Sequence, residues 1–264
     1  KKFTRHKHNP LNNSSLSDND VKCFLKDRNG CIWAGTSAGG INFYNKANSN
    51  FSTIGEAIKP NFGLNNAIVS AILKENSEAL WVGTYGGGLN YLDLKNKISA
   101  SYIVDQKDEK KTRNLITALA DRGNNQLLCG TFNGLFQFDK STKQFSQISL
   151  SANGLAEDER PITSLLMDDG DIWVGTNGNG IKRVLKNGTV ENYRDDDSPN
   201  SLSDNFVTDI ENRKNGIWIA TQNGLNFFDK TLKKVTRIYR TNTPKRIGNN
   251  SLTVLFTDSR GRLW

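Results

Sequence analysis

The fold of this chain is decided by residues 81–91, which read Trp81-Val82-Gly83-Thr84-Tyr85-Gly86-Gly87-Gly88-Leu89-Asn90-Tyr91. An apolar run ends on Trp-x-Gly-Thr, a glycine-rich turn follows, and a second apolar run begins. Two such runs around a short glycine turn are typical of an antiparallel hairpin. The same unit returns along the chain, with its anchor residue at Trp33, Trp81, Leu128, Trp173, Trp218 and Trp264.

The anchor recurs every 45 to 48 residues. Each anchor follows an apolar strand that ends on an acid, as at Val69, Ile72 and Glu75, and each unit closes with a more polar strand, as at residues 190–193. Four short antiparallel strands per repeat predict an all-β fold, a β-propeller of four-stranded blades. We expect one propeller domain over residues 1–264, with complete blades at about 20–54, 68–103, 115–148, 162–193 and 207–239, and partial blades at 1–8 and 252–264.

Each anchor residue has an expected structural role. The tryptophan would be a wedge between blades because it buries a large apolar area. The glycine of Trp-x-Gly-Thr would let a neighbouring backbone approach closely. Because Leu128 replaces the tryptophan, the third blade is expected to be the least well packed.

The composition of the chain argues against several classes of function. The chain carries a net charge of +8, but its lysines are scattered through every repeat, which indicates a solvated surface and no nucleic acid partner. No apolar run reaches the length of a membrane helix. The three cysteines, Cys23, Cys31 and Cys129, have no metal-binding spacing and are interpreted as small core residues, so no metal is expected.

Catalytic signatures are scarce. The chain has two histidines, His6 and His8, both near the N-terminus, so no Ser-His-Asp or Cys-His set can be assembled within the blades. The acidic run 195–197 is interpreted as a solvated turn, with a loop calcium site as the alternative. We expect no catalytic residues and no cofactor.

The repeat resembles a known family, the regulator-propeller repeat. The resemblance is carried by residues 81–91, by Asp258-Ser259-Arg260-Gly261-Arg262-Leu263-Trp264 and by the inter-blade segment Ser198-Pro199-Asn200-Ser201-Leu202-Ser203-Asp204-Asn205. It covers essentially the whole chain. The departures are Leu128, Ala220 in place of glycine, and a weak third strand after Gly180.

The resemblance implies a periplasmic, oligosaccharide-sensing segment of a Bacteroidetes hybrid two-component histidine kinase that controls polysaccharide-utilisation genes. It implies a seven-bladed propeller. Because residues 3–6 match the outer strand of a blade and Trp264 falls inside another strand, we expect this chain to be a fragment of a longer propeller array. The implied partners are an oligosaccharide ligand, a second propeller and an immunoglobulin-like domain of the same chain, and a second receptor copy in a homodimer. Two alternatives stay open: a non-catalytic propeller scaffold for protein interaction, and a propeller lyase.

Ligand binding is predicted on the loops that join the second and third strands of each blade and on those that connect one blade to the next. These two loop sets leave the same end of a four-stranded meander, and long loops on a rigid scaffold often carry binding. Aromatic rings can stack on sugars, amides match hydroxyls, and arginines suit uronate or sulfate groups. The predicted ligand residues are Tyr85, Phe132, Asn133, Asn177, Asn179, Gln222, Asn223, Arg113, Arg160 and Arg194.

Overall fold

The computed structural model describes residues 4–27, 30–45, 47, 50–57, 62–108, 112–151, 160–241, 247–258 and 260–264. The chain divides into two compact units, residues 1–119 and 120–264. The boundary between the units lies within strand β9 (Ile116–Gly123). Each unit is described by itself below.

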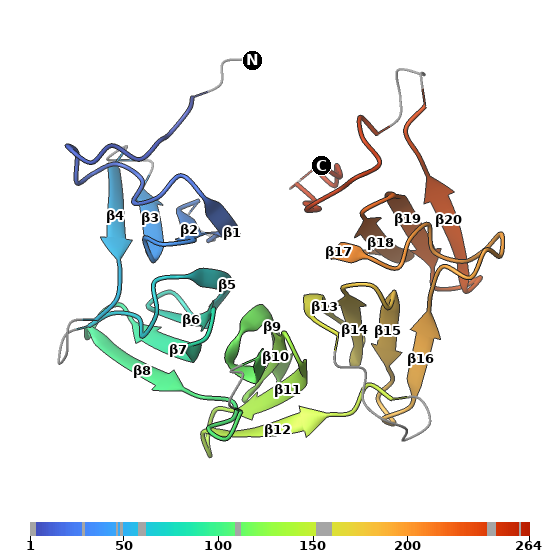
Figure 1. Ribbon diagram of the computed structural model, residues 1–264, viewed down its shortest axis with the longest axis horizontal. Helices are drawn as coiled ribbons and strands as arrows, with labels where there is room; N and C mark the ends of the chain where they lie inside the picture. The colour runs from blue at the N-terminus through green and yellow to red at the C-terminus, as the bar shows by residue number, and fades with distance from the viewer. Residues whose placement is uncertain are drawn as a thin grey trace. The chain divides into compact units, whose positions relative to one another are not determined.

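Strands β1–β20 form five four-stranded sheets, each with its strands in sequence order (Figure 1). We call these sheets blades 1 to 5. Their strands are β1 (Val21–Lys26), β2 (Ile32–Thr36), β3 (Ile41–Asn45) and β4 (Asn50–Ile54); β5 (Val69–Lys74), β6 (Ala79–Thr84), β7 (Gly88–Asp93) and β8 (Ile98–Tyr102); β9, β10 (Gln126–Thr131), β11 (Gly134–Asp139) and β12 (Gln144–Ile148); β13 (Ile162–Asp168), β14 (Asp171–Thr176), β15 (Ile181–Val184) and β16 (Val190–Tyr193); and β17 (Val207–Arg213), β18 (Gly216–Thr221), β19 (Gly224–Asp229) and β20 (Lys234–Ile238). A short 3-10 helix, η1 (Thr112–Asn114), precedes β9.

Every blade is an antiparallel meander, which confirms the predicted all-β fold class. In blade 2 the start of the first strand pairs with the end of the second, Val69 with Thr84, and the register shifts by a bulge before Ala71 pairs with Gly83. The second strand, β6, is buried at all of its residues. A strand that is buried on both faces reads as a continuous apolar run, which is why the anchor stands out in the sequence.

The chain ends are only partly described. Thr4–Lys7 form no strand, and residues 1–3, where the predicted outer strand begins, lie outside the described residues. Near the other end, Thr257 bridges Leu263 in antiparallel fashion. None of the described residues forms a helix of the length and hydropathy needed to span a bilayer.

The anchor residues lie in apolar clusters within each unit. In the first unit Trp33 packs with Val69 and Val82, which belong to the first and second strands of the next blade. In the second unit Trp173 packs with Val207 and Ile219 in the same way. Leu128 is fully buried at the equivalent position of blade 3. The anchor residue therefore works as an inter-blade wedge within each unit.

The glycine of Trp-x-Gly-Thr is needed for a reason that differs from the expected one. A Cβ atom at Gly83 would lie 2.4 Å from Cγ2 of Ile116, and one at Gly35 would lie 2.5 Å from Cγ1 of Val69. The approaching group is thus a β-branched side chain that begins the next blade, so the prediction of a close backbone is wrong at these positions. Ala220 breaks the glycine rule where Leu252 stands at that position of the following repeat.

Candidate functional site

The blade-connecting loops and the turns between second and third strands meet at one end of each blade. The amide of Tyr85, just after β6, donates to the carbonyl of Ile68, just before β5, at 3.0 Å. The amide of Gln222 donates to the carbonyl of Phe206 in the same way, at 3.1 Å. The first and second strands of a blade therefore hold both loop sets together, as predicted from the meander.

The loops that lead into blades 3 and 5 also reach the turn of the preceding blade. The carbonyl of Asn114 accepts from the amide of Gly86, and the carbonyl of Asn205 accepts from the amide of Gly178, each at 3.1 Å. Both glycines have a positive φ, 102° at Gly86 and 100° at Gly178, which glycine adopts without strain. The turn conformation thus allows the loop of the next blade to dock.

An asparagine side chain closes each of these loops. Asn205 Oδ1 accepts from the amide of Asp195 at 2.9 Å, and its Nδ2 donates to the carbonyl of Asp195 at 3.3 Å. Asn114 clamps Asp105 in the same way, with Nδ2 donating to its carbonyl at 2.9 Å. Asn19 and Asn250 accept from the amides of His8 and Arg240, at 2.8 and 2.6 Å. We call these four side chains the asparagine clamps.

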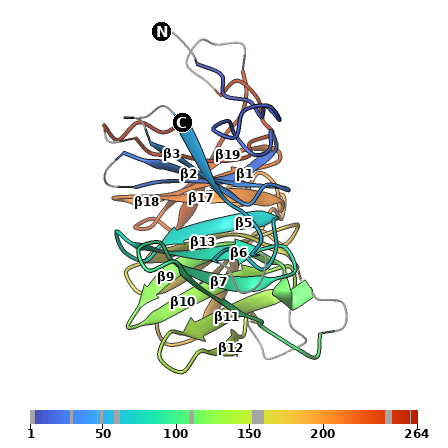
Figure 2. The same ribbon diagram turned by 90° about the vertical axis from the view of Figure 1, so that its left-hand side faces the viewer.

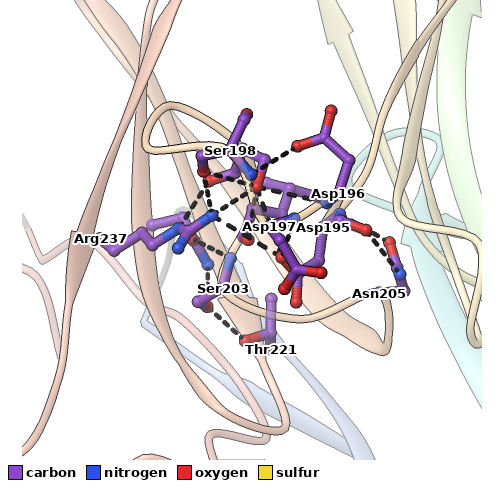
Figure 3. Close-up of polar contacts among 11 residues, drawn as sticks. Asp195, Asp196, Asp197, Ser198, Ser203, Asn205, Thr221 and Arg237 are labelled. Carbon is purple, nitrogen blue, oxygen red and sulfur yellow. Dashed lines mark hydrogen bonds and ion pairs between the residues drawn. The ribbon is translucent and has the colours of Figure 1, made fainter.

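A second support holds the loop before blade 5. Arg237, on β20, donates from Nε to the carbonyl of Ser201 at 2.8 Å and from Nη2 to the carbonyl of Ser198 at 2.7 Å (Figure 3). Its guanidinium also lies 3.7 Å from Asp195 Oδ1. On the other side of the loop, Ser203 Oγ and Thr221 Oγ1 are 3.1 Å apart. The loop therefore has a defined shape although it contains no strand.

Removing a clamp should loosen its loop. We expect Asn205→Ala to lower the free energy of unfolding by about 1–2 kcal/mol, because two part-buried backbone groups of Asp195 lose their partner. Hydrogen exchange at the Asp195 amide should accelerate. The control is Asn187→Ala, which removes an exposed turn acceptor and should change stability by less than about 0.5 kcal/mol. Unchanged exchange in Asn205→Ala would contradict the clamp.

The predicted aromatic residues are exposed at the loop ends. The side chain of Tyr85 is 41% exposed and that of Phe132 is 37% exposed. Sequence reasoning missed two further apolar side chains, Ile68 at 37% and Phe206 at 42%. Both stand immediately before the first strand of a blade, at a position that the repeat alignment could have singled out. The loop ends thus present more apolar surface than expected.

The predicted arginines differ in how exposed they are. Arg113, in η1, donates from Nη1 to Asp105 Oδ2 at 2.9 Å and supports its own loop. Arg160 and Arg194 are exposed. In the second unit, a Cβ at Gly178 would lie 3.3 Å from the Phe206 ring and 3.7 Å from Arg160 Nη1. The structure therefore brings Arg160 and Phe206 together over one turn.

The predicted amides serve mainly as turn residues. The backbone amides of Asn133, Asn179 and Asn223 each donate to a threonine Oγ1, at 3.0, 3.1 and 3.2 Å. Asn223 Oδ1 also accepts from Asn250 at 3.3 Å. Asn177 and Gln222 have exposed side chains. These last two remain the amides best placed to contact a ligand.

In the first unit the loop end opens into a groove of about 520 Å³. It is lined by side chains from the first two blades and from the start of β9. These are Lys22, Ser37, Ile68, Ser70, Tyr85 and Thr117. Among the predicted residues Tyr85 belongs to this groove, and Arg113 is not among its lining residues.

The acidic run 195–197 uses its carboxylates as hydrogen-bond acceptors for backbone amides of its own loop. Asp196 Oδ1 accepts from the amide of Ser198 at 3.0 Å, and Asp195 Oδ1 accepts from the amide of Asp197 at 3.4 Å. Hydrogen bonds from Ser198 and Ser201 lower the pKa of Asp196 below its usual value. Within the described part of the chain, no three His, Cys, Asp or Glu side chains gather in a way that could hold a metal ion.

Two family models match the sequence. The model described as "SMP-30/Gluconolactonase/LRE-like region" matches residues 70–263, and the one described as "Two component regulator propeller" matches residues 15–38. The second match confirms the regulator-propeller resemblance. No curated protein matches this sequence.

Solved structures share the fold. The extracellular domain of the putative hybrid two-component system BT3049 from B. thetaiotaomicron is 21% identical, with a TM-score of 0.79 over 98% of this chain and 34% of that chain. The corresponding domain of BT4673 from the same organism is 20% identical, with a TM-score of 0.65 over 98% and 38%. An ancestral GH74 enzyme is 14% identical, with a TM-score of 0.67 over 98% and 35%. This chain thus spans about a third of the length of these structures, and the likeness shows a β-propeller fold.

Proposed function

This chain belongs to the SMP-30/gluconolactonase/LRE-like family, and from that premise and its regulator-propeller repeat we propose that it is a ligand-sensing propeller of a two-component receptor. The extracellular domains of two putative hybrid two-component systems share its fold. By analogy with those domains, we place the chain in the periplasm, with residues 1–264 as a fragment of a single propeller domain. We propose further that the full receptor carries other domains in the same chain, forms a homodimer and controls polysaccharide-utilisation genes.

The ligand we propose is an oligosaccharide that binds at the loop ends of the blades. The observation that carries this is the pair of exposed aromatic side chains, Tyr85 and Phe132, at equivalent positions after the second strand. An exposed ring on a rigid strand end can stack on the apolar face of a sugar. The asparagine clamps hold the neighbouring loops, so little ordering is needed on binding.

Calorimetry with a panel of plant and host oligosaccharides tests this proposal. We expect at least one oligosaccharide to bind, and Tyr85→Ala or Phe132→Ala to weaken it about tenfold or more, by loss of a stacked ring. Leu232→Ala is the control, because Leu232 is 65% exposed at the opposite end of blade 5, in the turn between β19 and β20. If an oligosaccharide binds and both aromatic substitutions leave its affinity unchanged, the loop ends are the wrong site.

A hydrolase that opens lactones is the second candidate, because the gluconolactonase-like model covers most of the chain. Opening a lactone needs a water activated by a base or a metal. Both histidines already have partners within the fold: His8 Nδ1 lies within hydrogen-bond distance of the carbonyl of Leu16, at 2.8 Å, and the His6 ring packs on Tyr44 and Phe51. Acceleration of gluconolactone hydrolysis by the purified protein, with and without added Ca²⁺ or Zn²⁺, would favour this candidate over a sensor.

A further inference from the structure

One position of the repeat carries a side-chain hydroxyl in every copy of the repeat except the first. It is the second residue of the first strand in each blade, and the corresponding residue near the chain end. The residues are Lys22, Ser70, Thr117, Thr163, Thr208 and Thr253. Lys22 is therefore the exception: a long cationic side chain stands where the other copies of the repeat have a short side chain with a hydroxyl.

In the first unit, three residues of this row line the groove beside Tyr85. Strand β1 packs beside β5 (Figures 1 and 2). Lys22, Ser70 and Thr117 all line the 520 Å³ groove. Ser70 Oγ is already used in the fold, since its one O–H lies within hydrogen-bond distance of the carbonyls of Gly83 and Ile116. Among the six lining residues, Lys22 alone carries a charge.

Lys22 is held loosely. Its Nζ lies 2.8 Å from Asp20 Oδ2, and the two side chains are 45% and 58% exposed. An ion pair this exposed contributes little, because water and salt screen it. Asp20 Oδ2 also accepts from Ser37 Oγ at 2.6 Å, so its carboxylate keeps a partner when Lys22 turns toward a ligand. The ammonium can therefore be redirected into the groove at small cost.

The groove combines this cation with surfaces that suit a sugar. Ile68 and Tyr85 give it exposed apolar faces, and Ser37 and Thr117 bring hydroxyl groups. A groove of this volume falls in the range of small-molecule sites. A ligand that matches all of these features has a sugar ring to stack on Tyr85 and an anionic group to meet Lys22.

We propose that Lys22 makes this groove selective for oligosaccharides that carry a carboxylate or sulfate group. The inference rests on the proposed function and names the chemical class of its ligand. The anion would accept charge-assisted hydrogen bonds from the Lys22 ammonium, which are about twice as strong as neutral ones. The other copies of the repeat have an uncharged hydroxyl side chain at this position and so provide no such preference for an anion.

The test is a glycan array that contains acidic oligosaccharides and their neutral counterparts, for example oligogalacturonates and the same oligomers as methyl esters. The strongest binder should be acidic, and its affinity should fall as ionic strength rises. Lys22→Thr introduces the residue that most other copies of the repeat have at this position. It should lower the affinity for the acidic binder about tenfold or more and leave the affinity for neutral binders unchanged. Lys22→Arg should retain most of the affinity.

Lys26→Thr is the matched control. Lys26 lies on the same strand, is also exposed, and is not among the residues that line this groove, so the substitution removes the same charge elsewhere. If the strongest binder is neutral, or if Lys22→Thr and Lys26→Thr act alike on an acidic one, the inference is overturned while oligosaccharide sensing stands. If no oligosaccharide binds, the proposed function fails and the inference fails with it.

Discussion

Trp173→Ala is expected to lower the free energy of unfolding by about 3–5 kcal/mol, the usual loss for a large aromatic side chain removed from a core. Trp173 is fully buried, between its own blade and the next. Its ring lies 5.1 Å from that of Phe228, edge to face, and 5.9 Å from that of Tyr193, stacked. The guanidinium of Arg183 covers the ring at 5.0 Å. These neighbours are fixed by strands and cannot collapse fully into the space.

Chemical denaturation, followed by far-ultraviolet circular dichroism and by fluorescence, measures this loss. Trp173→Phe should lose less than Trp173→Ala because it leaves a smaller cavity, and it keeps the prediction testable if the alanine variant does not fold. The control is Leu232→Ala, which removes a 65% exposed side chain from the same unit and should change stability by less than about 0.5 kcal/mol. Equal losses at Trp173 and Leu232 would contradict the wedge.

Gly83→Ala is expected to lower the free energy of unfolding by about 1–3 kcal/mol, as overpacking does. The added methyl group would lie 2.4 Å from Cγ2 and 2.9 Å from Cβ of Ile116, and 3.3 Å from Cβ of Ala71. Ile116 is fully buried and begins the next blade, so its side chain has no free space into which it can turn. The methyl group must push β6 and β9 apart.

A double-mutant cycle with Ile116→Ala identifies the cause. Ile116→Ala alone should be destabilising by about 2–5 kcal/mol. Because it removes the atom that lies closest to the new methyl group, the double variant should be more stable than the sum of the single losses predicts, by about 1 kcal/mol. Additive losses would place the strain elsewhere than between Gly83 and Ile116.

The recurring acid of the repeat shows how far one motif can diverge in its contacts. Glu75 Oε2 accepts a hydrogen bond from Trp81 Nε1 at 2.7 Å, and Asp258 Oδ2 accepts one from Trp264 Nε1 at 3.1 Å. In blade 4 the equivalent Asp168 instead lies 2.7 Å from Lys230 Nζ, in blade 5. The sequence shows that an acidic residue recurs at this position of the repeat. Its partner depends on which side chains the neighbouring blade supplies.

By itself the sequence determined the blade architecture. The spacing of the anchors, the apolar run before each of them and the glycine turn after it specify hairpins, because strand and turn formation depend on residues that are close in the chain. The end of the blade at which the loops meet followed as well, since a meander of four strands allows one arrangement. That Tyr85 and Phe132 follow the second strand was therefore predictable.

Only the tertiary structure decided what those loops do. The asparagine clamps join residues about ten positions apart across irregular backbone, and the exposure of Ile68 and Phe206 depends on how each loop docks. The groove around Lys22 needs side chains from three consecutive blades and their loops, about 95 residues from first to last. Such contacts depend on the packing of one blade against another. A periodic pattern shows that packing must occur, but not which atoms it brings together.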